Sequence, residues 1–407
     1  MNRRVVITGM GLLSPLGEGV SVNWEALLEG RSGISNISKF DTSEFPIKIA
    51  GEIKSDLLDH FSVKDKKKID PFIQYALVAA KEAIADANLT QKEGVGVIIG
   101  SGQGGINNIE EQQARVQSGR YNRVTPYFIP SSVIGMAAGH VSAHFGFDGP
   151  SYGVSSACAT SAHAIIDACK TIRLGEADVM IAGGSEATIT PLSLAGFARI
   201  NALSHQFDTP ETASRPFDRE RDGFVSSEGA GILVLEELES ALRRNAPIYA
   251  EIGGYGMSSD AFHATAPHPE AHGQIKALDK ALRSSNTNAK QVDYINAHGT
   301  STALNDRIET KAIKKTFGEH AKKLSISSTK SMTGHMLGAA GATELIFSAK
   351  TIEKGIIPPT INLHNADPDC DLDYTPNEAK TKNVDVCLSN SFGFGGTNTS
   401  ILLKKVS

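Results

Sequence analysis

Residues 155–175 read SSACATSAHAIIDACKTIRLG, and residues 327–355 read SSTKSMTGHMLGAAGATELIFSAKTIEKG. Each stretch begins with two serines, passes through small residues into a helical pattern and closes on Lys-Thr-Ile-x-x-Gly. The closing motifs, at 170–175 and 350–355, lie far apart in the chain. This shared order favours an internal duplication over a chance similarity of two helix ends. We therefore expect two related halves meeting near residue 250, with a functional site at their junction, where pockets commonly form.

Short runs rich in β-branched residues recur along the rest of the chain. Most are continuously apolar, which is typical of strands buried on both faces. They are RRVVITG (3–9), VGVIIGS (95–101), ADVMIAGG (177–184), GILVLEE (231–237), YAEIGGYG (249–256), VDYINAHG (292–299), KLSISSTK (323–330) and VCLSNSFG (386–393). Helical patterns lie between several of them, as at 73–89 and 275–286. Alternating strands and helices predict an α/β layered fold.

The composition of the chain excludes several classes of protein. Its 407 residues are 40% hydrophobic and 21% charged, which is ordinary globular usage, and the formal net charge of −5 argues against general nucleic-acid binding. No apolar run approaches the roughly 18 residues of a membrane span. The four cysteines show no C-x-x-C spacing, and the N-terminal MNRRVVITGMG resembles a first strand more than a signal peptide. We expect a soluble cytoplasmic protein with reduced thiols.

Cys158 lies among small residues where a helix is expected to open. The unpaired N–H groups of a helix N-terminus stabilise a thiolate, and small neighbours leave room for a substrate. The local pattern leaves two interpretations open, a nucleophile or a buried inert cysteine. Cys169, three helical turns further on, is interpreted as a core residue, as are Cys370 and Cys387.

Two histidines in the second half could assist a thiol. His298 ends a strand-like run in NAHGTST (296–302), and His335 lies five residues after Lys330 in STKSMTGHMLG (328–338). The loop NSFGFGGTN (390–398) could turn tightly or offer a backbone N–H to a substrate oxygen. GSGQGG (100–105) fits the dinucleotide pattern G-x-G-x-x-G, but no acid follows about 20 residues later, so a nicotinamide-dependent oxidoreductase is disfavoured.

Taken together, these motifs resemble the elongating β-ketoacyl-acyl carrier protein synthases, most closely the type II enzymes of bacterial fatty-acid synthesis. The resemblance extends from VVITGMGLLSPLG (5–17) to NSFGFGGTNTSILLKK (390–405). It implies the thiolase fold, with duplicated α/β halves packed in five α-β-α-β-α layers and usually paired as a homodimer. Residues 1–250 would form the half with the nucleophilic cysteine, and residues 251–407 the half with both histidines.

The resemblance also implies the role of individual residues. By this resemblance, Cys158 is the acyl-accepting nucleophile, and His298 and His335 are the paired catalytic histidines. Lys330 is the supporting lysine, and Glu344 is the acid beside it. The oxyanion and gate residues are Phe394 and Phe392, and the pantetheine contacts are Thr300 and Thr302. Many relatives have proline where Ala303 stands, which should not affect the chemistry.

The implied reaction is the decarboxylating condensation of malonyl-acyl carrier protein with an acyl group held on Cys158, giving a 3-oxoacyl carrier protein. It needs no redox cofactor and no catalytic metal, and a structural monovalent cation near Asn296 or Asn390 stays open. Because acyl carrier proteins are strongly acidic, the basic cluster of Lys64, Lys67 and Lys68, together with Arg123, is a candidate docking patch.

Other interpretations of the same motifs are weighed against this one. A ketosynthase subunit of an aromatic polyketide system shares the Cys-His-His set and is the nearest rival. An inactive chain-length-factor partner would lack the nucleophile, yet Cys158 is present. Starter-type synthases carry asparagine where His335 stands, and thiolases supply a second reactive cysteine near the C-terminus.

Overall fold

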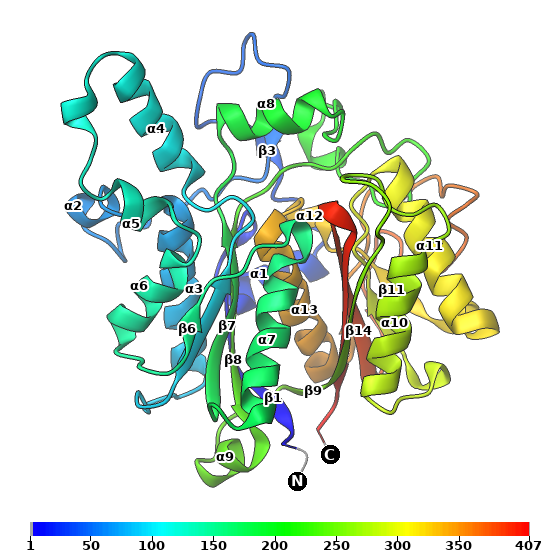
Figure 1. Cartoon of the computed structure of the whole chain (residues 1–407). Coiled ribbons are helices and arrows are strands. Elements are labelled where there is room, and N and C mark those ends of the chain that lie inside the picture. Colours follow the sequence, from blue (N-terminus) through cyan, green and yellow to red (C-terminus); the bar gives the residue numbers. More distant parts are fainter. Residues whose placement is uncertain (1–2, 407) are drawn as a thin grey trace.

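The computed structural model describes residues 3–406, which form a mixed sheet flanked and divided by helices (Figure 1). Along its main path the strands run β11-β10-β14-β15-β9-β1-β8-β7-β5-β6, with β2 paired to β1. The strands are β1 (Val5–Ser14), β2 (Gly17–Glu18), β3 (Ser35–Asn36), β4 (Ile49–Ala50), β5 (Gly96–Gly100), β6 (Ser151–Tyr152), β7 (Val179–Glu186), β8 (Gly229–Glu237), β9 (Ala250–Ser259), β10 (Tyr294–Asn296), β11 (Ser325–Ser327), β12 (Ile356–Ile357), β13 (Lys380–Thr381), β14 (Val386–Gly393) and β15 (Thr397–Lys404).

The helices cover both outer faces of this sheet and fill its middle. They are α1 (Val20–Leu28), α2 (Val63–Lys66), α3 (Pro71–Asp86), α4 (Ile106–Gln117), α5 (Phe128–Ser132), α6 (Met136–Phe145), α7 (Thr160–Leu174), α8 (Pro191–Arg199), α9 (Leu238–Arg243), α10 (His272–Ser284), α11 (Ala303–Phe317), α12 (Lys330–Thr333) and α13 (Ala340–Lys354). Short 3₁₀ turns are η1 (Tyr121–Arg123), η2 (Ala157–Ala159), η3 (Pro210–Thr212), η4 (Ala289–Gln291), η5 (Gly318–Lys323), η6 (Leu337–Ala339) and η7 (Phe394–Gly396). Within residues 3–406 no helix has both the length and the apolar character needed to cross a membrane.

The two halves of the sheet repeat the same topology. From the edge inward, the first half runs β6-β5-β7-β8-β1 and the second runs β11-β10-β14-β15-β9. In each half the three outer strands are parallel and the next two join antiparallel. The halves meet through a short antiparallel pairing of β1 with β9, Val6 with Glu251 and Ile7 with Ala250. The prediction of a duplicated α/β fold is confirmed.

The central helices α7 and α13 explain the sequence echo (Figure 1). Both have 15 residues, and each occupies the same place in its own copy of the repeated motif. Each follows a 3₁₀ turn whose first residue has a left-handed backbone, Ala157 with φ 51° and Leu337 with φ 45°. Each ends on a left-handed glycine, Gly175 or Gly355, which lacks the Cβ that this conformation disfavours.

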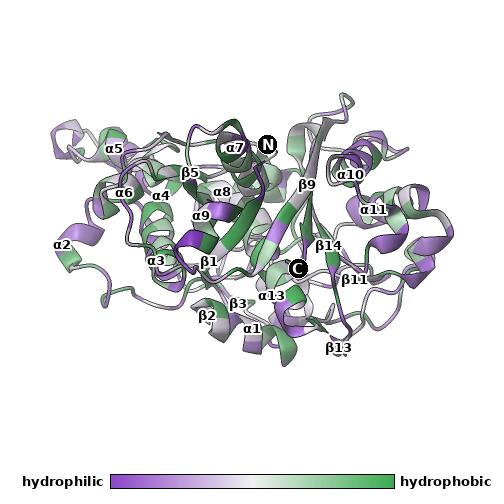
Figure 2. Ribbon diagram, turned by 90° about the horizontal axis from the view of Figure 1, so that it is seen from below, coloured by the Kyte–Doolittle hydropathy of each residue, from purple (hydrophilic) through white to green (hydrophobic). Residues whose placement is uncertain are grey.

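Three apolar clusters separate the helical layers. The central cluster packs α7 and α13 between the two halves of the sheet. The second cluster packs α3 and α6 against β5, β7 and β8, and the third packs α10 and α11 against β10 and β14. The outward sides of α10 and α11 carry hydrophilic residues (Figure 2). This layering, helix-sheet-helix-sheet-helix, is the arrangement expected for the thiolase fold.

Candidate active site

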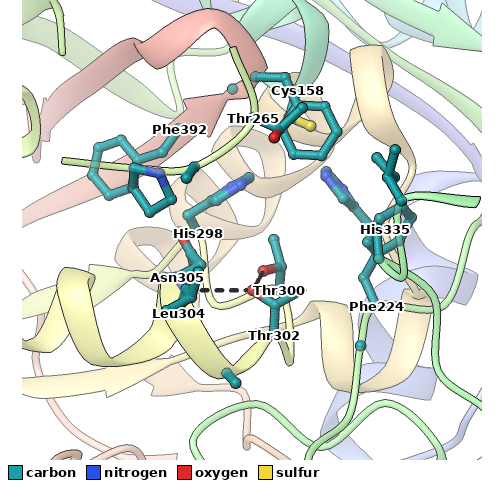
Figure 3. A pocket seen from close by; sticks show the side chains of 18 of the residues that line it. Cys158, Phe224, Thr265, His298, Thr300, Thr302, Leu304, Asn305, His335 and Phe392 are labelled. Carbon is teal, nitrogen blue, oxygen red and sulfur yellow. Dashed lines mark hydrogen bonds between the residues drawn. The ribbon is translucent and has the colours of Figure 1, made fainter. Parts of the chain in front are cut away.

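A cavity of about 310 Å³ opens where the two halves meet (Figure 3). The first half contributes Cys158 and Phe224, and the second contributes His298, His335 and Phe392. The Cys158 sulfur and one nitrogen of each histidine lie within 4.8 Å of one another. Side chains that are distant in sequence, such as Cys158 and His335, therefore converge on one point.

Cys158 is the middle residue of η2, one residue before the turn passes into α7. The left-handed backbone of Ala157 turns the chain sharply there, and Cys158 is 9% exposed at the cavity. Burial raises the pKa of the Cys158 thiol to about 12, while the Lys330 charge and the Phe394 backbone N–H oppose that rise. Desolvation outweighs the backbone N–H groups at this turn, so the thiol form of Cys158 is favoured at rest.

The two histidines lie edge to face, with ring centroids 5.4 Å apart. Burial, reinforced by the nearby Lys330 charge, holds both pKa values well below the usual range of histidine. Both imidazoles are therefore neutral at pH 7, and each carries one N–H donor and one acceptor nitrogen.

Lys330 decides which nitrogen of His298 carries the proton. Its Nζ lies 3.3 Å from His298 Nδ1 and also forms a buried ion pair with Glu344. An ammonium group can only donate, so Nδ1 accepts and the proton resides on Nε2. Burial raises the pKa of Glu344 to about 7, and the Lys330 charge opposes that rise. The predicted pairing of Lys330 with Glu344 is found in the structure.

Glu309, on α11, fixes the backbone that carries His298. Its carboxylate accepts hydrogen bonds from the N–H groups of His298 at 2.9 Å and Gly299 at 2.8 Å, and from the Asn390 side chain at 3.1 Å. Sequence analysis did not single out Glu309. The available signal was its position shortly after His298, on the buried face of α11.

Thr300 and Thr302 line the same cavity on the side of α11. Their hydroxyls lie 3.0 Å apart. Thr302 caps α11 by accepting from the Asn305 N–H at 3.4 Å, the contact dashed in Figure 3. The buried guanidinium of Arg221 donates to the carbonyls of Thr302 and Ala303, both at 3.1 Å. Arg221 is a second positioning residue that sequence analysis missed.

The glycine-rich loop after β14 closes over Cys158. Phe392 is buried with its ring 5.8 Å from that of His298, and Phe394 is half-buried beside the cavity. Gly393 packs closely against the segment that leads into η2, because a Cβ on it would lie 2.9 Å from the Ser156 carbonyl oxygen. The Gly395 N–H donates to the Ala264 carbonyl at 2.7 Å, which ties this loop to the segment before α10.

The GSGQGG loop does not have free backbone donors for a phosphate. The buried carboxylate of Glu186 accepts from the Gly102 N–H at 2.8 Å, the Gln103 N–H at 3.1 Å and, across the junction, the Gly338 N–H at 2.9 Å. The protein thus fills with its own acid the place that a pyrophosphate would need.

The candidate docking lysines lie on another part of the molecule from the cavity. Lys64 and Lys67 are exposed on and just after α2, and Lys68 is half-buried and pairs with Asp65 at 2.6 Å. Arg123 is in η1, which follows α4. In Figure 1, α2 and α4 lie at the opposite side of the molecule from α10 and α11.

Two groups of donors could in principle hold a metal ion. Cys158, His298 and His335 form a compact set of soft ligands. Asn296 is fully buried, and its Oδ1 has no hydrogen-bond partner in the described part of the chain, so it supplies one oxygen toward the monovalent cation left open by the sequence. Asn390 instead accepts from Ser400 at 2.8 Å and donates to Glu309.

Comparison with known proteins gives consistent results over the whole chain. Residues 2–241 match the family model of the β-ketoacyl synthase N-terminal domain, and residues 249–364 match that of the C-terminal domain. The chain is 50% identical over 409 aligned positions to 3-oxoacyl-[acyl-carrier-protein] synthase 2 of Coxiella burnetii, covering 99% of both proteins. It is 47% identical to the protein of the same name from Synechocystis, covering 99% of this chain and 98% of the other.

Solved structures with the same fold are also similar along the full length. A type II polyketide ketosynthase, solved in complex with its acyl-carrier protein and bound to the hexaketide, superposes with a TM-score of 0.93 at 37% identity and complete coverage of both chains. A β-ketoacyl synthase from Burkholderia phymatum gives a TM-score of 0.92 at 34% identity, again with complete coverage.

Proposed function

The chain belongs to the β-ketoacyl synthase family, and we propose that it elongates fatty acids by condensing malonyl-acyl carrier protein with an acyl group held on Cys158. The observation that carries the proposal is the cluster of one thiol and two neutral imidazoles, backed by Lys330, in a cavity between the halves. This set provides a nucleophile, a proton acceptor and two N–H donors without a cofactor.

The first step transfers the acyl group from the carrier thioester to Cys158. The Cys158 sulfur forms a new C–S bond, the C–S bond to the carrier breaks, and the carrier thiolate takes up a proton. Because the resting thiol is protonated, its proton needs an acceptor, and His335 offers one, since neither ring nitrogen has a partner in the described structure. The N–H groups of Cys158 and Phe394 serve as the oxyanion hole.

The second step decarboxylates the malonyl thioester. The bond to the carboxylate breaks, carbon dioxide leaves, and the electron pair moves toward the thioester oxygen as an enolate. Nε2–H of His298 and an N–H of His335 donate to that oxygen. The carbanion then attacks the acyl carbonyl, a C–C bond forms, the C–S bond to Cys158 breaks, and the released Cys158 thiolate takes up a proton from solvent.

The remaining parts of the proposal concern binding and assembly. Thr300 and Thr302 contact the pantetheine arm, and Lys64, Lys67, Lys68 and Arg123 attract the acidic carrier. Residues 1–250 and 251–407 act as the nucleophile half and the histidine half, which the repeated strand order supports. The enzyme works in the cytoplasm as a homodimer. A second copy would cover the exposed apolar side chains of Val116, Tyr121, Ile129 and Val133.

The aromatic polyketide alternative is kept for one observation, the 37% identity to a ketosynthase that binds a hexaketide. The identity of 50% to a 3-oxoacyl-[acyl-carrier-protein] synthase 2 favours fatty-acid elongation. Co-purification with an inactive paralogue would favour the polyketide system.

The test supplies purified protein with malonyl-carrier and a series of acyl-carriers and resolves the products by mass. We expect products two carbons longer than each accepted acyl group, with a 3-oxo group, and carbon dioxide in equal amount. Acylation without carbon dioxide release and chain extension would contradict the proposal.

A further inference from the structure

Two of the described side chains that line the cavity have every polar atom buried without a hydrogen-bond partner. One is His335, which has a place in the proposed reaction, and the other is Gln274, whose Nε2 and Oε1 are both unpaired. Gln274 is 1% exposed, and leaving such a buried amide unpaired costs about 1–3 kcal/mol. Because Gln274 lines the cavity, a molecule that enters the cavity can supply the missing partners.

The fold holds Gln274 in this position. It is the third residue of α10, and the residue before it, Gly273, is packed so closely that a Cβ would lie 2.1 Å from Asp260 Oδ1 and 2.3 Å from Asn398 Nδ2. Asp260 and Asn398 are themselves hydrogen-bonded at 3.0 Å and line the cavity. The close packing of Gly273 thus holds the first turn of α10 against the glycine-rich loop. Because this turn is held in place, the Gln274 side chain stays at the cavity.

The unpaired atoms define the chemistry of the partner. Nε2 needs an acceptor and Oε1 needs a donor, whereas acyl chains offer neither and carboxylates and phosphates only accept. Of the groups on the proposed substrates, the pantetheine arm carries two secondary amides in series, which supply both a C=O and an N–H.

We propose that Gln274 binds the pantetheine arm of the substrate, donating from Nε2 to one amide carbonyl and accepting at Oε1 from an amide N–H. This inference rests on the proposed function and adds a specificity contact on α10 to the cavity that Thr300 and Thr302 also line. Gln274 acts in recognition of the arm and takes no part in bond making.

The test removes the amide from each partner in turn. Gln274→Met keeps the length of the side chain without its polar atoms, and three acyl thioesters carry two amides, one amide or none: pantetheine, N-acetylcysteamine and ethanethiol. Acylation of Cys158 is followed by mass to give kcat/KM. We expect Gln274→Met to lower kcat/KM roughly 5- to 30-fold with the pantetheine thioester, less with N-acetylcysteamine and not at all with the ethyl thioester.

Gln112→Met is the matched control, because the Gln112 amide is already paired. It accepts from the Thr125 N–H and donates to Asn108, both at 3.1 Å, and it does not line the cavity. Gln112→Met should lower the melting temperature and leave the ratios among the three thioesters unchanged. Gln274→Met should melt at or above the wild-type temperature, because it removes an unpaired buried amide.

Equal losses with all three thioesters, no loss with the pantetheine thioester, or a lower melting temperature without ligand would each overturn the inference. The proposed function fails separately, if the wild-type enzyme neither becomes acylated on Cys158 nor condenses malonyl-carrier.

Discussion

Burial alone does not distinguish Cys158 from the other cysteines. It raises the pKa of Cys158 to about 12 and that of Cys169 to about 11. What sets Cys158 apart is its contact with the cavity, the Phe394 N–H and the two imidazoles, whereas Cys169 is fully enclosed in α7. These neighbours are the reason for proposing Cys158, and not Cys169, as the nucleophile.

Cys158 should therefore be the residue that becomes acylated. Cys158→Ala should abolish acylation and condensation with the fold intact, because the side chain is small and already adjoins a cavity. Cys169→Ala should keep acylation and lose some stability to the space it leaves in the core. Peptide mass mapping after incubation with an acyl-carrier locates the adduct, and an adduct on Cys169 would refute the assignment.

His298→Ala and His335→Ala should each lower carbon dioxide release from malonyl-carrier by about 10²–10³-fold, because each removes a donor to the enolate oxygen. The neutral imidazoles are the active forms, and both pKa values lie well below 6.5. Decarboxylation should therefore persist as the pH falls below 6.5, and be lost only when the pH passes the lowered pKa values. A pH profile of carbon dioxide release checks this, and a loss centred on pH 6.5 would contradict it.

The residues that sequence analysis missed share a physical cause. Motifs marked Cys158, His298 and His335 because glycines and small residues surround them. Glu309 and Glu186 lie in ordinary helix and strand segments, and they matter only because folding brings distant backbone N–H groups to their carboxylates. Such contacts leave no local pattern.

At the scale of elements, glycine packing decides where strands and loops run. The strand expected at 3–9 continues to Ser14, because Gly9 and Gly11 let it lie directly against α3. A Cβ on them would lie 2.2 Å from the Ala83 oxygen and 1.9 Å from the Ala79 oxygen. Gly9 and Gly11, which the sequence analysis interpreted as the end of the strand, are the positions where β1 lies closest to α3. β15 was not predicted as a strand.

Close packing at a glycine also fixes the glycine-rich loop beside Cys158. Gly393→Ala should push the loop away from the turn of Cys158, since the added Cβ meets the Ser156 carbonyl. We expect acyl transfer to fall by about 100-fold, the cost of a small misplacement of the oxyanion donor. Gly196→Ala on α8 is the control, because nothing lies within 4 Å of its Cβ. Equal acyl-transfer rates for wild type and Gly393→Ala would show that the loop tolerates displacement.

At the scale of the whole molecule, the candidate docking lysines lie apart from the cavity that holds Cys158 and the two histidines. Changing Lys64, Lys67 and Lys68 to Glu should raise KM for the acyl-carrier and flatten its salt dependence, because exposed charges mainly speed association. Turnover of an acyl-pantetheine, which lacks the carrier, should hardly change. Lys68 should contribute least, since it is paired with Asp65.

Lys276→Glu with Lys290→Glu is the control for charge alone. Both lysines are exposed, on α10 and in η4, and Figure 1 shows α10 on the far side from α2. Steady-state kinetics at several salt concentrations compare the two variants. A similar rise in KM for both would mean that net charge, and not the cluster, attracts the carrier.

Glu186 occupies the space that a side chain at Gly338 would need. Gly338 is the middle residue of η6 in the second half, the place that Cys158 holds in η2 of the first, and a Cβ there would lie 2.5 Å from Glu186 Oε2. The duplicated turn therefore has no room for a second thiol. In the proposed reaction each chain would hold one acyl group at a time, and the lengthened product would leave on its carrier and return to solution between rounds, so synthesis would be distributive.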